Sequence, residues 1–325
     1  MHQRAGKIVH LFRQENGFIS GEHLSRELGV SRAAVWKHIS ALRKSGYSIE
    51  AIPSRGYRLL AAPDVMDSHG IGAGLAGCLM GKRLEIREQT TSTNADAFRL
   101  AEEGAAEGTV VIADSQSGGK GRRGRIWSSP PQVNLYCSVI LRPSIMPQGA
   151  PQLTFLSAVA VARAIELTTP LVPEIKWPND LLISGKKVAG LLNEMSAETD
   201  GVNFVILGIG VNINMTGDQF PADLSYPATS LMLESGLPVN RSHFAGVMLH
   251  ELDRLYDEFR RRGFGPIREE WQRRCNANGH RLQVTDSGTE PISGIFAGID
   301  GDGALLLDTG HTKLHRVTCG DVRIL

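Results

Sequence analysis

The sequence contains little cysteine, and its cysteines form no pairing pattern. They are widely separated, with no Cys-x-x-Cys pair and no pair of histidines at metal-ligand spacing. A disulfide framework and a structural zinc site are therefore not expected. The four residues are Cys78, Cys137, Cys275 and Cys319.

Long hydrophobic runs and a strong net charge are absent as well. No uninterrupted apolar stretch reaches membrane-spanning length, and the first residues hold no apolar segment followed by a small-residue cleavage site. The formal net charge is only +1, which gives no overall attraction to nucleic acid or to an acidic membrane. We therefore expect a cytoplasmic protein with no membrane partner.

The chain does have enough length and apolar content for several packed domains. It holds 325 residues, of which 42% are hydrophobic, so two or three domains are expected. Changes in the residue pattern predict three units, at residues 1–62, 64–274 and 275–325.

The first 61 residues are strongly basic although the whole chain is nearly neutral. They hold ten Lys and Arg residues against four Glu, a local charge of +6. Apolar spacing predicts a helix over 18–28, a turn, and a second helix from a Ser31 cap to about Lys44. Two short strands follow, over 47–52 and 56–60. Together these elements predict a winged helix-turn-helix domain.

The second of these helices presents side chains that suit contact with a major groove. Val35, Ile39 and Leu42 form its inward stripe, which leaves Trp36, His38 and the charged residues to face outward or sideways. Charge, turn position and a basic wing agree, so we predict binding to DNA; binding to a protein is the alternative. The predicted DNA contacts are Ser31, Arg32, Trp36, Lys37, Arg55 and Arg58.

Residues 119–127 join three glycines to four cationic side chains and an indole, in the order Gly-Lys-Gly-Arg-Arg-Gly-Arg-Ile-Trp. Glycines let backbone N–H groups approach a ligand, and arginine forks pair with phosphate oxygens at two points. The segment therefore predicts a phosphate-binding loop, with a solvated turn or an RNA-binding tract as the alternative. A P-loop is disfavoured because no Gly-Lys-Ser/Thr closes the segment.

This loop is one of five motifs that occur in order between residues 90 and 214. The others are Thr91-Ser92-Thr93-Asn94, Lys176-Trp177-Pro178-Asn179-Asp180, the run Lys187-Val188-Ala189-Gly190-Leu191-Leu192-Asn193-Glu194, and Gly208-Ile209-Gly210-Val211-Asn212. In this order the motifs resemble those of the biotin protein ligase family. The sequence departs from the family at Lys120, where members often carry arginine, so the charge is kept but the bidentate fork is lost.

The resemblance implies a multidomain fold and an enzyme activity. The fold would combine the N-terminal winged helix-turn-helix, a central α+β ligase domain with a mixed or antiparallel sheet, and a C-terminal SH3-like β-barrel. The enzyme would use ATP to convert biotin into biotinyl-5′-AMP and would then transfer biotin to one lysine of a biotin carboxyl carrier protein. In bifunctional members the resemblance also implies a biotin-responsive repressor, with a homodimer forming on adenylate binding.

The resemblance assigns roles to residues of these motifs. It implies catalysis by Arg122 and Lys187, ATP and Mg²⁺ as cofactors, and a metal contact at Asp180, for which a turn-forming role after Pro178 is the alternative. The biotin contacts it implies are Ser92, Thr93, Asn94, Gln116, Lys120, Gly121, Arg122, Lys187, Gly190, Leu192 and Gly208. The nucleotide contacts it implies are Arg122, Arg125, Trp127, Asn179 and Lys187. Trp177 is expected to pack rather than to bind.

The register of the hairpin at residues 187–212 decides which side chains share a face of the sheet. A two-residue turn would bury the unpaired carboxylate of Glu194, which is costly. We therefore predict a three-residue turn at 199–201 with Gly201 left-handed. The core face would hold Ala189, Leu191, Met195, Val205, Leu207, Ile209 and Val211. The other face would hold Gly190, Leu192, Gly208 and Gly210 as a flat trough for a thin ligand, unless these glycines mark bulges.

The remaining pattern predicts helices, strands and a flap around this hairpin. Strands are expected over 109–113 and 134–140, helices over 152–167 and 240–262, a flap over 215–230, and C-terminal strands over 280–285, 292–299, 304–308 and 311–317. The C-terminal strands would complete the ATP site, dock the carrier or act as a structural cap.

Three other functions compete with a ligase that is also a repressor. One is a ligase whose N-terminal domain regulates nothing. Another is a lipoate-type ligase, which shares the catalytic architecture implied by the resemblance. A protein that only binds nucleic acid explains least, because it leaves the motifs after residue 64 without a purpose.

Overall fold

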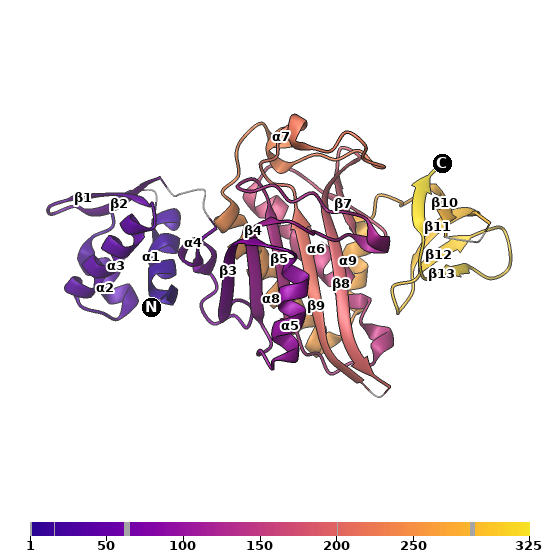
Figure 1. Ribbon diagram of the computed structural model, residues 1–325, viewed down its shortest axis with the longest axis horizontal. Helices are drawn as coiled ribbons and strands as arrows, with labels where there is room; N and C mark the ends of the chain where they lie inside the picture. The colour runs from indigo at the N-terminus through magenta and orange to yellow at the C-terminus, as the bar shows by residue number, and fades with distance from the viewer. Residues whose placement is uncertain (1, 16, 62–65, 200, 287–289) are drawn as a thin grey trace.

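The computed structural model describes residues 2–15, 17–61, 66–199, 201–286 and 290–325. Its elements form three units in a row, with the N-terminal helices and the C-terminal strands at opposite ends of the molecule (Figure 1). This arrangement agrees with the predicted multidomain fold. The predicted boundary near residue 62 falls among residues 62–65, which lie outside the described residues, so the division itself stays a prediction.

The N-terminal unit is a helix-turn-helix with a two-stranded wing, as its pattern predicted. It consists of α1 (His2–Gln14), α2 (Gly21–Leu28), α3 (Arg32–Lys44), β1 (Ser48–Ile52) and β2 (Gly56–Ala61). Ser20 and Ser31 cap α2 and α3 by accepting backbone N–H groups, and Gly29 (φ 61°) ends α2. Helix α1 is an addition to the prediction, and its buried Ile8 and Phe12 join the core of this unit.

A seven-stranded mixed sheet forms the centre of the molecule, as predicted. Its strands are β3 (Arg83–Thr90), β4 (Thr109–Gln116), β5 (Leu135–Leu141), β6 (Glu174–Lys176), β7 (Asp180–Ile183), β8 (Lys186–Glu198) and β9 (Gly201–Val211). Their order in the sheet is β3-β4-β5-β9-β8-β7-β6. The β3–β4 pair is parallel, and the other neighbouring pairs are antiparallel.

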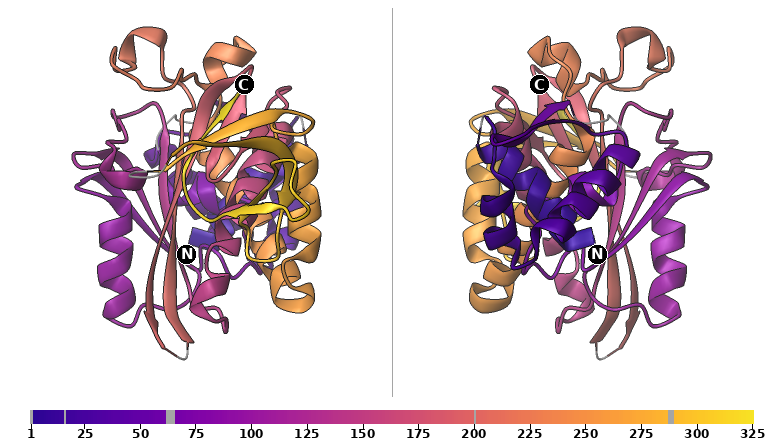
Figure 2. Two further views of the ribbon diagram at one scale, coloured as in Figure 1. Left: turned by 90° about the vertical axis from the view of Figure 1, so that its right-hand side faces the viewer. Right: turned by 90° about the vertical axis from the view of Figure 1, so that its left-hand side faces the viewer.

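Helices cover the two faces of this sheet unequally (Figure 2). On one face, α6 (Gln152–Thr168), α8 (Arg241–Arg262) and α9 (Gly265–Arg274) enclose the main hydrophobic core. On the other face, α5 (Thr93–Glu102) packs on β4, β5 and β9 and leaves β7 and β8 uncovered. The shorter helices are α4 (Ser68–Gly72), α7 (Leu231–Ser235), η1 (Arg122–Gly124), η2 (Pro147–Gly149) and η3 (Gly217–Gln219). None of the helices described is both long and apolar enough to span a membrane.

The β8–β9 hairpin has the predicted faces but a shorter turn. Gly190 lies opposite Gly210, so the glycines share one face and the apolar residues share the other. Glu198 pairs with Gly201, which makes the turn shorter than predicted. A register shift between Ser196 and Ala197 compensates for the shorter turn, so the rest of the hairpin keeps its predicted faces. The three-residue turn was therefore wrong, and Asp200, which it contains, lies outside the described residues.

Met195 also departs from its predicted place in the core. It lies opposite Val205 on the apolar face, but it is 46% exposed. Strand β7 ends its pairing with β8 at Gly190, so the following part of β8, which carries Met195, is an edge of the sheet in the described residues. Glu194 lies on the opposite face, outside the core, as predicted.

The C-terminal unit is a five-stranded antiparallel sheet in the order β13-β12-β11-β10-β14. Its strands are β10 (Arg281–Thr285), β11 (Ile292–Ile299), β12 (Leu305–Asp308), β13 (His315–Val317) and β14 (Asp321–Ile324). Strand β13 is shorter than predicted, and β14 was not predicted. Within the described ranges no pairing joins β13 to β14, so the sheet is compatible with an SH3-like barrel without showing a closed one.

Trp177 connects the central unit to the C-terminal sheet. It is 3% exposed, and its indole Nε1 donates a hydrogen bond to the carbonyl of Gly303 over 3.1 Å. The backbone N–H of Asn276 bonds to the carbonyl of Ile175 in β6. The packing role predicted for Trp177 is therefore what the structure shows.

Candidate functional site

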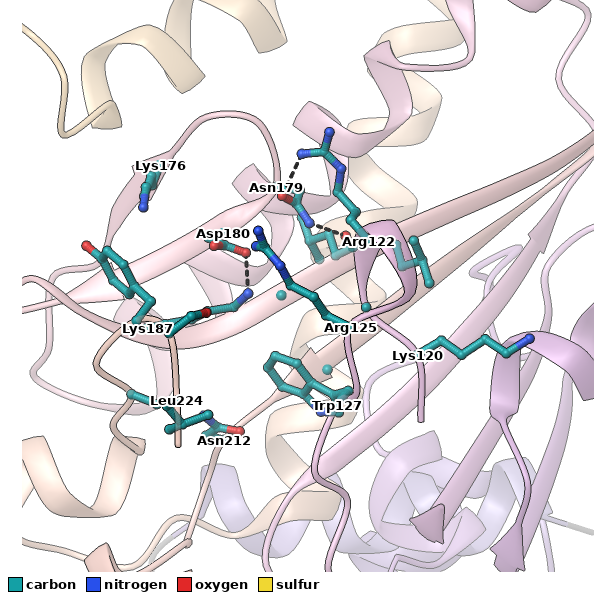
Figure 3. A pocket seen from close by; sticks show the side chains of 18 of the residues that line it. Lys120, Arg122, Arg125, Trp127, Lys176, Asn179, Asp180, Lys187, Asn212 and Leu224 are labelled. Atoms are coloured by element: carbon teal, nitrogen blue, oxygen red, sulfur yellow. Dashed lines mark hydrogen bonds and ion pairs between the residues drawn. The ribbon is translucent and has the colours of Figure 1, made fainter. Parts of the chain in front are cut away.

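A cavity of about 710 Å³ lies on the face of the sheet that α5 leaves open (Figure 3). Strands β8 and β9 form its floor, and its walls come from the 119–127 loop, residues 176–180, the predicted flap and β14. All five sequence motifs contribute lining residues, so the fold gathers motifs that are far apart in the sequence. Every residue predicted to contact biotin, nucleotide or metal lines this one cavity, and their contacts with ligands stay predictions.

One end of the cavity is neutral and closely hydrogen-bonded; we call it the neutral end. Gln116 accepts the backbone N–H of Thr93 over 2.8 Å and donates to the Ser129 hydroxyl over 3.0 Å. The buried hydroxyl of Ser138 lies 2.8 Å from Thr93 Oγ1 and 2.6 Å from Asn94 Oδ1. These groups have partners without a ligand, so the fold holds them in place beforehand.

Asn94 ties the neutral end to strands β8 and β9. Its amide donates to the carbonyl of Leu192 over 3.1 Å and to the carboxylate of Glu194 over 2.7 Å. A Cβ added to Gly208 would lie only 2.3 Å from Asn94 Oδ1. Glycine is therefore required at position 208 for the Asn94 amide to reach β8.

The glycine face was predicted to be an open trough. In the structure it is not open, because the Trp127 ring lies on it. Cβ atoms added to Gly190 and Gly210 would come within 2.9 and 2.7 Å of that ring. The two glycines thus make room for the indole, and any ligand shares the floor with Trp127. A prediction from strand alternation alone could not place a side chain that arrives from a distant loop.

Five residues form one row across the floor, one on each of five adjacent strands. In order they are Tyr136 of β5, Gly210 of β9, Gly190 of β8, Asp180 of β7 and Lys176 of β6. Directly opposed residues project to the same face of a sheet. Lys187, at the start of β8, places its ammonium 2.5 Å from Asp180 Oδ1. Figure 3 shows Asp180 between Lys176 and Lys187; we call this the cationic end.

Arg122 lies between the cavity and a smaller neighbouring one of about 450 Å³. Its guanidinium donates to Asn179 Oδ1 over 3.2 Å, and Asn179 in turn donates to the Leu191 carbonyl. Burial lowers the pKa of Arg122 from its ordinary value. Lys120, by contrast, is exposed and points away from Asp180 (Figure 3), so its ammonium is not gathered with the others.

The other arginines of the loop are held by carboxylates of the C-terminal unit. Arg123 pairs with Asp286, and Arg125 pairs with Asp321 in β14. Arg123 has φ 57°, a conformation that few non-glycine residues adopt. The C-terminal sheet therefore forms one wall of the cavity through charges as well as through packing.

Lys176 and Tyr226 line the cavity but were not predicted as site residues. The Lys176 ammonium lies 3.8 Å from the centroid of the Tyr226 ring, a cation–π contact. Burial lowers the pKa of Lys176. The flap that carries Tyr226 is fastened beside Lys187, whose N–H bonds to the Pro227 carbonyl over 2.8 Å. The flap was predicted from its composition, but its contacts with the two lysines carry no sequence signal.

A metal ion has little to bind at the predicted position. Asp180 lies in strand β7 and pairs with Lys187, so it is not the turn residue of the alternative prediction. Among the residues that the structure describes, no group of three or more His, Cys, Asp or Glu side chains could hold a metal. The described side chains therefore supply at most a single carboxylate at this position, and the metal contact of Asp180 stays a prediction.

The wing and α3 form a second candidate surface, far from the cavity. Trp36 is 59% exposed on α3. The guanidinium groups of Arg55 and Arg58 lie 4.3 and 4.8 Å from the ring centroid of Phe18, and Arg58 also pairs with Glu50 over 2.7 Å. The aromatic ring and the carboxylate fix the direction of these cations on the wing.

The remaining predicted DNA contacts behave differently from one another. Lys37 is exposed, Ser31 caps α3 with its hydroxyl, and Arg32 pairs with Glu22 over 2.8 Å. His38, predicted to face outward or sideways, is only 8% exposed. Burial lowers its pKa, because an imidazolium loses hydration inside the helix bundle. The helix stripe is therefore wider than the three apolar residues indicated.

Taken together, the cavity suits a ligand with a neutral polar head and an anionic tail. Hydroxyl and amide groups of the neutral end can satisfy donors and acceptors of the head. Lys187 and the arginines of the loop can neutralise carboxylate or phosphate groups. The glycine floor and the Trp127 ring between the two ends allow a flat, apolar segment to connect them.

Three family models match successive parts of the chain. The HTH domain matches residues 4–58, the Biotin/lipoate A/B protein ligase family matches residues 86–212, and the Biotin protein ligase C terminal domain matches residues 279–324. The three models follow the same order as the three units of the structure.

Relatives and solved structures agree with these matches. The bifunctional ligase/repressor BirA of Bacillus spizizenii is 44% identical over 307 residues, covering 93% of each chain, and that of Bacillus subtilis is 43% identical over 98% of this chain and 97% of its own. A biotin protein ligase from Aquifex aeolicus, solved in complex with biotin and ATP, is 27% identical with a TM-score of 0.65, covering 75% of this chain and 100% of that one. The chain therefore belongs to the biotin protein ligase family, with the helix-turn-helix, ligase and C-terminal domains of the bifunctional members.

Proposed function

We propose that this chain activates biotin with ATP, transfers it to a lysine of a biotin carboxyl carrier protein, and represses transcription through its N-terminal domain. One observation carries the enzymatic part: a single cavity joins a pre-organised neutral end to a cationic end through a glycine floor. Biotin has matching parts, a neutral ureido head, an apolar tail and a terminal carboxylate. ATP supplies the second anion that the cationic end is suited to hold.

The proposed activation step brings two anions together at Lys187. The biotin carboxylate attacks the α-phosphorus of ATP, the bond from that phosphorus to the bridging oxygen breaks, and pyrophosphate leaves with the bonding electrons. Lys187 exchanges its contact with Asp180 for contacts with the carboxylate and the α-phosphate, and Arg122 supplies a second positive charge. Asn179, Arg125 and Trp127 line the nucleotide side.

The proposed biotin contacts divide between the head and the tail. Thr93, Asn94 and Gln116 face the ureido group with groups that are already oriented by hydrogen bonds. The other proposed contacts lie along the floor and the loop; they are Ser92, Lys120, Gly121, Arg122, Lys187, Gly190, Leu192 and Gly208. Among these Lys120 stands apart, because its ammonium is turned away and must swing inward to take part.

The proposed transfer step needs no covalent link to the enzyme. Biotinyl-AMP is a mixed anhydride, and the carrier's lysine amine attacks its carbonyl carbon while AMP leaves. The 119–127 loop, closed over the cavity, keeps water from the anhydride until the carrier arrives. Lipoate is the competing substrate, and two relatives named biotin–[acetyl-CoA-carboxylase] ligase, which are 37% and 32% identical over 67% and 79% of this chain, favour biotin.

The proposed repressor activity rests on the basic wing and on the exposed face of α3. Trp36, Lys37, Arg55 and Arg58 lie on the accessible side of this domain, together with Arg32 and the Ser31 end of the helix. We further propose that adenylate binding promotes a homodimer that occupies two operator half-sites, and that the protein works in the cytoplasm, where ATP and carrier are made. A domain with no regulatory role is the alternative.

The deciding experiment measures transfer of labelled biotin to a carrier domain in the presence of ATP and Mg²⁺, with unlabelled lipoate as competitor. We expect unlabelled biotin to reduce the transfer of label and unlabelled lipoate to leave it unchanged. Competition by lipoate would identify a lipoate-type ligase, and no transfer to any carrier would refute the ligase function. Protection of a DNA segment near biotin genes, dependent on biotin and ATP, tests the repressor in the same preparation; absence of protection would support the non-regulatory alternative.

A further inference from the structure

Lys176 is a cation of the cavity to which no role has yet been given. Its ammonium makes no ion pair with any residue in the described part of the chain, and it rests on the ring of Tyr226 at 3.8 Å. By contrast, Lys187 pairs with Asp180, and Arg125 pairs with Asp321. Lys176 is therefore a half-buried charge that no carboxylate at ion-pair distance balances among the described residues.

The strand register fixes where Lys176 lies relative to the reacting groups. It is directly opposite Asp180, which is directly opposite Gly190, the glycine under the Lys187 ammonium. Lys176 is thus two strands beyond the proposed reaction centre, about 10 Å at the usual strand spacing. The neutral end lies toward β5 and β9, in the opposite direction along the sheet. An anion at Lys176 is therefore on the side of the reaction centre away from the biotin head.

The activation step requires a positive charge at that side. When the carboxylate attacks the α-phosphorus in line, the leaving oxygen departs from the opposite side, and negative charge grows on the β- and γ-phosphates. Lys187 and Arg122 serve the attacking carboxylate and the α-phosphate in the proposed function. The leaving group would otherwise face Asp180, a carboxylate that repels it.

We propose that Lys176 binds the β- and γ-phosphates of ATP and holds the pyrophosphate as it leaves, with the Tyr226 ring covering the ammonium until the nucleotide enters. The proposal rests on the ligase function proposed above. A cation–π contact in a partly buried site is weaker than a charge-assisted hydrogen bond to phosphate, so a polyphosphate displaces the ring. The flap carrying Tyr226 would then move when ATP binds.

The test separates the two half-reactions in full-length protein. In Lys176→Met we expect the KM for ATP in adenylate formation, and the KM for pyrophosphate in its reversal, to rise about tenfold or more, as for loss of one charge-assisted contact. The KM for biotin, and transfer from supplied biotinyl-AMP to the carrier, should stay within about twofold of the wild type, a small fraction of a tenfold effect. Lys176→Arg should restore most of the ATP and pyrophosphate affinity.

Lys186→Met is the matched control, because it removes the same charge from an exposed lysine that pairs with Glu234 outside the row. It should behave as the wild type. Equal losses in both half-reactions of Lys176→Met, or no loss in either, would overturn the proposal. Lys176→Gln repeats the test with a polar side chain if the methionine variant folds poorly. A wild-type protein that forms no adenylate would refute the ligase function itself, an outcome distinct from failure of the variant.

Tyr226→Leu tests the placeholder role of the ring separately. Removing the ring leaves Lys176 without its cation–π partner, so the KM for ATP should stay equal or fall by a few-fold. A tenfold rise instead would show that the ring itself binds the nucleotide, and the placeholder role would be wrong. The KM for pyrophosphate is measured in the same variant. It should also stay equal or fall if the ring only covers Lys176.

Discussion

The two ends of the cavity hold their polar groups in opposite ways. At the neutral end, Thr93, Asn94 and Gln116 make hydrogen bonds to other groups of the protein. A ligand can bind there without displacing these partners. At the cationic end, Lys187 and Arg125 are paired with carboxylates that a polyanion must displace. The first arrangement favours recognition of a fixed shape, and the second favours a reaction in which charges move.

The difference follows from the cost of burial. Hydroxyl and amide groups can be buried at little net cost once their hydrogen bonds are made within the protein. An unpaired ammonium or guanidinium cannot, so the fold gives most of these cations a temporary partner of opposite charge or an aromatic ring. The temporary partner lowers the affinity for phosphate, but it allows the loop and the flap to stay ordered without substrate.

The largest expected effect is at Lys187. In Lys187→Met the carboxylate and the α-phosphate lose their shared cation, and the nearby Asp180 repels both anions. We expect the rate of biotinyl-AMP formation to fall about 10²- to 10³-fold, as for removal of one group that stabilises transition-state charge. Pyrophosphate exchange with labelled pyrophosphate measures this rate directly. If the rate fell by less than tenfold, the reaction would not depend on Lys187 exchanging Asp180 for the substrate anions.

The next largest effect is expected at Arg122, which we expect to slow the dissociation of biotinyl-AMP. Arg122→Gly removes a half-buried guanidinium that bonds only to a neutral amide, Asn179, among the partners described, and so is free to turn to an anion. We expect biotinyl-AMP to dissociate about ten- to a hundredfold faster, as for loss of a hydrogen bond to a charged group. Release is followed by stopped-flow tryptophan fluorescence, since Trp127 and Trp177 both line the cavity. Arg123→Gly, which removes the neighbouring cation facing Asp286, should change the release rate much less.

A smaller effect is expected at the neutral end. Ser138→Ala removes the hydroxyl that lies between Thr93 and Asn94, and one of their two buried oxygens loses the donor that this hydroxyl supplies. We expect the free energy of unfolding to fall by about 1–3 kcal/mol and the Kd for biotin to rise about tenfold, with the KM for ATP unchanged. Thermal unfolding and calorimetric titration with biotin measure the two changes. An equal loss of ATP affinity would show that the two ends are not independent.

The sequence predicted those parts of the fold in which neighbouring residues suffice to determine the outcome. The Ser31 cap, the helices at 152–167 and 240–262, and the sharing of a face by Gly190 and Gly210 all depend on local spacing. Strand β3 and helices α5 and α9 were not predicted, although they are long enough to show a pattern. The short strands β6 and β14 were also missed, because three or four residues give too little periodicity to distinguish a strand from a loop.

The site was predicted in its motifs but not in its connections. Ser138 gave no signal, because a single serine in an apolar strand looks like a core residue. Lys176 was read as part of a motif, but its meeting with Tyr226 depends on how the flap folds back. Trp127 was expected beside a nucleotide, and its position on the glycine floor depends on contacts between distant segments. Tertiary contacts of this kind are fixed by the whole fold and not by the pattern of any one segment.

The smallest predicted effect gives the sharpest test of the comparison, because it removes the charge nearest the neutral end while keeping its hydrogen bond. In Glu194→Gln the amide oxygen can still accept from Asn94, which now donates over 2.7 Å to the carboxylate. If geometry and not charge governs this end, the Kd for biotin should change by less than about threefold, under 1 kcal/mol, and should not depend on salt. Glu194→Ala, which removes the acceptor as well, should weaken biotin binding more. A tenfold loss in the glutamine variant that fades at high salt would show instead that both ends of the cavity act through charge.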